Sequence, residues 1–70
     1  MRHAHRPVPF HAVLLIAGTG YRVEVLRETP QRFLIEWQDR RTIRRGQRGR
    51  WFVRGGLHLV RKDAIAMESA

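Results

Sequence analysis

The sequence predicts a mainly β fold: a small, strongly bent antiparallel barrel of five to six strands, within a single domain. Three observations indicate it: the short length, the runs of alternating apolar and polar residues, and the glycines and prolines between those runs. A chain of 70 residues holds one domain. Five or six short strands within about 60 residues are too few for a two-sheet sandwich, and they suit a barrel that closes its own edges.

The N-terminal part predicts a tail followed by a strand. Residues 1–10 contain two prolines and two arginines, and we expect them to form a flexible basic tail. The apolar run His11–Ala17 follows, and Gly18–Gly20 ends it. This length and the flanking glycines favour a strand buried on both faces over a helix. The barrel domain is expected to span residues 11–67, with residues 68–70 frayed.

An antiparallel hairpin is the most clearly predicted unit. Apolar and polar residues alternate from Tyr21 to Glu28 and again from Arg32 to Gln38, which is the pattern of half-buried strands. Thr29-Pro30-Gln31 supplies the turn between them, because proline favours its first central position. The side chains expected to face the core are Tyr21, Val23, Val25, Phe33, Ile35 and Trp37.

The second half of the chain predicts a basic loop and further short strands. Residues 39–50 lose the alternation and are expected to form the loop. Gly55-Gly56 separates two runs with β character, and Arg61–Ala64 predicts one tight turn before the last strand. Strands are expected at Thr42–Ile43, Trp51–Arg54, Leu57–Val60 and Ile65–Met67.

Four segments carry a resemblance in the order of their elements. They are Gly20-Tyr-Arg-Val-Glu-Val25, Phe33-Leu-Ile-Glu-Trp37, Trp51-Phe-Val53 and Leu59-Val-Arg-Lys-Asp-Ala-Ile65. With the basic loop between the second and third, this order resembles an SH3-like small barrel of the Tudor or KOW type. That family places a one-turn 3₁₀ segment before the last strand, which matches Arg61–Ala64. The resemblance rests on element order and not on a signature motif, and an OB-like fold is the alternative.

Charge is the strongest indication of function. Fourteen Lys and Arg residues against six Asp and Glu residues give a formal net charge of +8, which favours encounters with polyanions. Guanidinium groups neutralise phosphates, and aromatic rings stack on unpaired bases. The run from Arg40 to Arg54 combines both groups and contains no acidic residue. The candidate nucleic-acid-binding residues are Arg40, Arg41, Arg44, Arg45, Arg48, Arg50, Trp51 and Arg54.

These observations support a hypothesis and one alternative. The hypothesis is a non-enzymatic DNA- or RNA-binding module of bacterial or mobile-element origin, cytoplasmic, whose arginines hold phosphates from a mobile loop. The alternative is a protein-interaction module in which the strand Val13–Ile16 pairs with a second copy and the basic loop docks an acidic partner. Core positions are favoured for both Trp37 and Trp51, because so small a barrel needs its large apolar side chains inside.

No catalytic, metal or cofactor site is expected. The chain has no cysteine and its acidic residues are scattered, so a thiol nucleophile is excluded and no carboxylate pair is indicated. His3, His5 and His11 have no carboxylate or thiolate nearby to complete a metal site. No apolar run approaches the roughly 18 residues of a membrane span. Leu57–Val60 lies where the type II plasmid dihydrofolate reductases, also SH3-like barrels, carry Val-Gln-Ile-Tyr, but the Gln and Tyr are missing.

Overall fold

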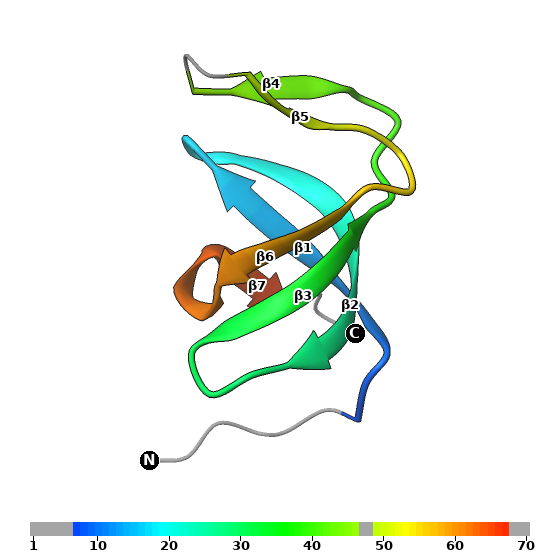
Figure 1. Cartoon of the computed structure of the whole chain (residues 1–70), viewed down its shortest axis with the longest axis vertical. Helices are drawn as coiled ribbons and strands as arrows, with labels where there is room; N and C mark the ends of the chain where they lie inside the picture. The colour runs from blue at the N-terminus through cyan, green and yellow to red at the C-terminus, as the bar shows by residue number, and fades with distance from the viewer. Residues whose placement is uncertain (1–6, 47–48, 68–70) are drawn as a thin grey trace.

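The computed structural model describes residues 7–46 and 49–67, and these form an all-antiparallel β structure (Figure 1). The described elements are β1 Phe10–Ile16, β2 Thr19–Glu28, β3 Arg32–Trp37, β4 Ile43–Arg45, β5 Arg50–Phe52, β6 Leu57–Arg61, the 3₁₀ turn η1 Lys62–Ala64 and β7 Ile65–Met67. The predicted mainly β, antiparallel class is therefore confirmed. Seven strands are described, which is more than the five or six expected for the barrel, and each of them overlaps a run with predicted β character.

The strands form two sheets. Five of them make one sheet in the order β6-β3-β2-β1-β7, and β4 and β5 make a separate hairpin, drawn at the top of Figure 1. Within the described residues no ladder joins β6 to β7, so the barrel expected from the sequence is not closed. β7 pairs only with β1 and β6 only with β3, so these two strands are the edges of the described sheet.

The predicted hairpin of β2 and β3 is confirmed. The backbone N–H of Thr29 donates to the carbonyl of Arg32 at 2.8 Å, and the N–H of Arg32 donates to Oγ1 of Thr29 at 2.9 Å, which closes the turn. The register shifts between Val25 and Arg27. Such a bulge bends the strand and strengthens its twist, so it helps the sheet to curl around the core.

The core lies on one face of the curled sheet. Its buried side chains are Ala12, Leu14, Val23, Val25, Phe33, Ile35, Trp37, Phe52 and Val60. Trp37 is completely buried, which confirms the core position expected for it. The strand expected to be buried on both faces, now β1, is buried on one: Leu14 lies in the core while Leu15 is exposed. A single-layer sheet covers only one side of an inner strand, which accounts for the difference.

The predicted loop 39–50 contains an ordered hairpin. β4 pairs with β5, and Ile43 lies opposite Phe52. The buried ring of Phe52 is 5.0 Å from the ring of Trp37 and 4.1 Å from the ring of His58, centroid to centroid. One face of the hairpin is therefore anchored in the core of the main sheet. The short strands expected at Thr42–Ile43 and Trp51–Arg54 are therefore found, with their bounds shifted to Ile43–Arg45 and Arg50–Phe52, and they take up part of the expected loop.

The ends of the predicted domain fall partly outside the described residues. Most of the expected basic tail (residues 1–6) and the expected frayed end (residues 68–70) are not among them. β1 begins at Phe10, the last residue of the predicted tail. Within the described part of the chain, no helix has the length and apolar character needed to cross a membrane.

Candidate nucleic-acid interface

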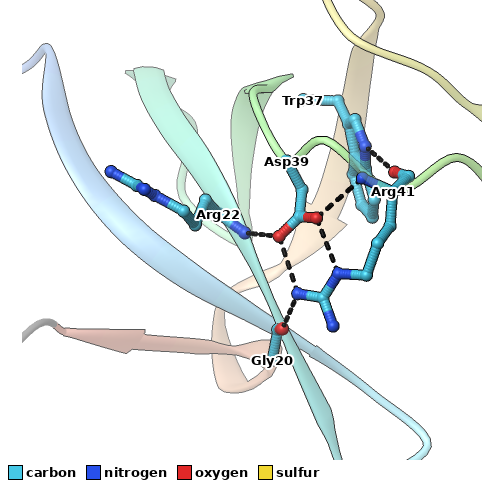
Figure 2. Close-up of polar contacts among 5 residues, drawn as sticks. All are labelled: Gly20, Arg22, Trp37, Asp39 and Arg41. Carbon is cyan, nitrogen blue, oxygen red and sulfur yellow. Dashed lines mark hydrogen bonds and ion pairs between the residues drawn. The ribbon is translucent and has the colours of Figure 1, made fainter.

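Asp39 is the one buried charged residue in the described part of the chain, and it organises the segment after β3. Its carboxylate accepts hydrogen bonds from the backbone N–H of Arg22 at 2.9 Å and from the backbone N–H of Arg41 at 2.9 Å (Figure 2). The Arg41 guanidinium donates two more, from Nε to Oδ1 at 2.7 Å and from Nη2 to Oδ2 at 2.8 Å. The side-chain hydrogen bonds from Arg41 are the largest cause that holds the pKa of Asp39 well below its usual range, and they outweigh desolvation.

Arg41 is engaged with the protein itself. Besides its bonds to Asp39, its Nη2 donates to the carbonyl of Gly20 at 2.8 Å, and its Cζ lies 4.5 Å from the ring centroid of Tyr21. Its backbone carbonyl accepts a hydrogen bond from Nε1 of Trp37 at 2.9 Å. These contacts tie the segment after β3 to β2 and to the core. A phosphate at this predicted site residue would therefore have to compete with Asp39.

An open depression of about 580 Å³ lies beside this ion pair. Its lining residues are Arg22, Gln38, Asp39, Arg40, Arg41 and Arg54. Four arginines and one aspartate give the depression a formal charge of +3. Because Arg41 is already paired with Asp39, that charge belongs to the other three. The side chain of Arg22 extends away from Asp39 in Figure 2, and only its backbone contacts the carboxylate. Arg40 and Arg54 belong to the predicted set.

Sequence reasoning missed Arg22. Arg22 lies well before the basic run in the sequence. The structure places it at the depression because the N–H of Gln38 donates to the Arg22 carbonyl at 3.0 Å, next to the β2–β3 ladder. The alternation of Tyr21 to Glu28 does place Arg22 on the outward face of its strand. Only the register between the two strands shows that this outward face lies beside residues 38–41.

The β4–β5 hairpin carries a second basic surface. Arg44 lies directly across from Trp51, so these side chains share the face that points away from the core. Cζ of Arg44 is 5.9 Å from the ring centroid of Trp51. Trp51 is 54% exposed, so the core position expected for it was wrong. Phe52 takes the inward position of β5 instead, and strand alternation then turns Trp51 outward.

Arg45 and Arg50 are cross-strand neighbours at the far end of this hairpin. Both are exposed. Like charges directly opposite each other in a ladder repel, and an anion bound between them would relieve the repulsion. Arg48, also predicted for the site, lies outside the described residues. The structure therefore divides the predicted set between the depression, with Arg40, Arg41 and Arg54, and the hairpin, with Arg44, Arg45, Arg50 and Trp51.

The histidines of the described chain form no metal centre. No group of three or more His, Asp or Glu side chains there is arranged to hold a metal ion. His11 is exposed on β1, whereas His58 packs against Phe52 on the inner side of β6. Burial, and to a smaller extent the positive charge of Arg50, lower the pKa of His58 from its ordinary value. His58 is thus a packing residue of the hairpin anchor.

Comparison of the chain with protein-family models, with curated proteins and with solved structures finds no match among any of them. The function is therefore inferred from the arrangement of these side chains.

Proposed function

We propose that the protein is a non-enzymatic nucleic-acid-binding module that holds the phosphate backbone of DNA or RNA with exposed arginines. The observation that carries the proposal is the depression beside Asp39, where Arg22, Arg40 and Arg54 gather. None of the ion pairs found within the described residues involves these three side chains. Clustering like charges without partners lowers stability, and phosphate binding would offset that cost.

The hairpin arginines would extend this contact surface. Phosphate contacts of this kind carry little sequence information, so binding should depend strongly on salt and weakly on sequence.

For the architecture we propose an SH3-like barrel that is open at one side. The bent antiparallel sheet and the 3₁₀ turn Lys62–Ala64, which directly precedes β7, support that assignment.

The test is fluorescence anisotropy of labelled oligonucleotides at several salt concentrations, with two triple variants. The first replaces Arg22, Arg40 and Arg54 by alanine; the matched control replaces Arg27, Arg32 and Arg61, which are exposed elsewhere and remove the same charge. We expect the first variant to bind at least about tenfold more weakly, with a shallower salt dependence. Equal losses of affinity in both variants would show that net charge alone determines binding. Absence of wild-type binding near physiological salt would refute the proposal.

A protein-interaction module is the second candidate. Leu57 and Leu59 are 58% and 53% exposed on β6, an edge strand of the described sheet, and Leu34 lies across from Leu59. A second copy packing on this face would cover the apolar surface. The segment expected to pair, Val13–Ile16, belongs to β1 between β2 and β7, so strand pairing there would have to displace β7.

Size-exclusion chromatography with light scattering distinguishes this candidate. A dimer that dissociates when Leu57 and Leu59 are replaced by threonine would support it, and a monomer at all concentrations would exclude self-association. In the other form of this candidate, an acidic protein would occupy the arginine depression. Uniformly weak binding to every polynucleotide, together with tight binding to an acidic polypeptide, would favour that form.

A further inference from the structure

We infer that the β4–β5 hairpin makes the module selective for single-stranded nucleic acid, because Trp51 stacks on an unpaired base. The inference rests on the proposed function and deepens it by naming the class of nucleic acid. Four features of the hairpin carry it: the exposed ring, the anchored strand that bears it, the guanidinium beside it, and the surrounding positive charge.

The exposure of Trp51 follows from how the hairpin is anchored. Its neighbour Phe52 is 3% exposed and packs between Trp37 and His58. Because successive side chains of a strand point to opposite faces, this anchor turns Trp51 into solvent. A domain of 70 residues has little apolar surface to bury. Tryptophan is the largest side chain, and leaving its ring half exposed gives up the stability that burial would add. A ligand that binds to the ring accounts for that loss.

The strand that carries the ring is paired and anchored in the core. β5 pairs with β4 along its full length, and Ile43 packs against the core together with Phe52. An aromatic side chain on an anchored strand loses little conformational entropy when a ligand binds to it. A base stacking on Trp51 would therefore meet a surface that is already in place.

Arg44 provides charge next to the ring. Its Cζ lies 5.9 Å from the ring centroid of Trp51, and its guanidinium packs against Gly49. A Cβ added at Gly49 would come within 2.8 Å of Nε and Nη2 of Arg44, so a side chain at residue 49 would have to displace the guanidinium from this position. A flat ring with an arginine beside it matches a nucleotide, whose base stacks and whose phosphate pairs with the charge.

The selectivity for single-stranded nucleic acid follows from the stacking of the bases in a duplex. In a duplex the faces of the bases are stacked on one another, so a protein meets mainly phosphates and groove edges. The arginines of the depression and hairpin contact phosphates in both kinds of ligand, whereas Trp51 gains a partner only when a base is unpaired. Trp51 should therefore add affinity for single strands and none for duplexes.

The experiment compares three labelled ligands by anisotropy at one salt concentration: an oligothymidylate, a duplex of the same length, and an abasic oligonucleotide of the same length. The abasic strand keeps the phosphates and lacks the bases. We expect Trp51→Ala to weaken oligothymidylate binding by about 30-fold, which is the middle of the range for one stacked base. Binding to the duplex and the abasic strand should change less than about twofold, and Trp51→Phe should retain most of the wild-type affinity.

Two outcomes overturn the inference and leave the proposed function standing: equal weakening on all three ligands, or no weakening on any. If the wild-type protein binds none of the ligands, the proposed function fails as well. A second measurement needs no variant. Stacking should quench the fluorescence of the exposed Trp51 when oligothymidylate is added, while the duplex and the abasic strand leave the emission unchanged.

Discussion

Arg41 and Asp39 form a double contact in which the guanidinium Nε and Nη2 lie 2.7 and 2.8 Å from Oδ1 and Oδ2 of the carboxylate. The pair also reaches β2, because Asp39 accepts from Arg22 and Arg41 donates to Gly20. Arg41 therefore holds the segment after β3 against β2, whereas Arg40 beside it is exposed. The same contacts fix the backbone from which Arg40 extends into the depression.

Replacing Asp39 by asparagine should destabilise the domain, because the amide cannot accept all four hydrogen bonds and leaves the Arg41 charge unpaired. We expect the melting temperature to fall by several degrees in a thermal unfolding experiment followed by circular dichroism. Asp63→Asn is the matched control, because its ion pair with Arg61 is exposed on both sides and contributes little. An equal effect of both substitutions would contradict the role assigned to Asp39.

The pH dependence of stability should carry the signature of His58. Its pKa is lowered in the folded protein, so the unfolded chain takes up this proton at a higher pH than the folded one. The stabilisation is therefore complete above the ordinary histidine pKa of about 6.5 and is lost as the pH falls through the folded value. Urea midpoints measured between neutral and mildly acidic pH should decrease. His58→Gln should remove this part of the slope, and His11→Gln, at an exposed position of β1, should keep it.

The predictable part of this fold is local in the sequence. The β2–β3 hairpin follows from two alternating runs and a proline turn, and the inward faces of both strands follow from the same alternation. Arg61–Ala64 likewise predicts the turn found at Lys62–Ala64. In each case, the signal lies within a few residues of the structure that it predicts.

The unpredicted part depends on contacts between distant segments. Trp51 and Phe52 are adjacent aromatics in a three-residue strand, and alternation allows either one to face inward. The choice is made by Ile43 across the ladder and by the rings of Trp37 and His58. Closure of the barrel likewise depends on a ladder between β6 and β7, which the described residues do not form and which no local pattern excludes.

The two tryptophans should respond differently to truncation. Trp37 is completely buried and lies 5.1 Å from the ring of Tyr21 and 5.0 Å from that of Phe52. Trp37→Ala should cost about 3–5 kcal/mol and unfold so marginal a domain. Trp51→Ala removes an exposed ring and should change the unfolding free energy by less than about 0.5 kcal/mol. Chemical denaturation of both variants checks this, and a folded Trp37→Ala protein would contradict the core described above.

Alanine substitutions at the two glycines of the β4–β5 turn separate the effect of backbone strain from the effect of displacing the Arg44 side chain. Gly46 and Gly49 both have positive φ, at 81° and 75°, so alanine at either position carries a backbone penalty of about 1 kcal/mol. A Cβ at residue 46 meets nothing within 4 Å, whereas one at residue 49 clashes with the Arg44 guanidinium at 2.8 Å. Both variants should lose stability for this backbone reason. Only Gly49→Ala should also weaken oligothymidylate binding in the anisotropy assay, since it displaces the charge beside Trp51. If the two variants bind oligothymidylate equally, the position of Arg44 beside Trp51 does not contribute to binding.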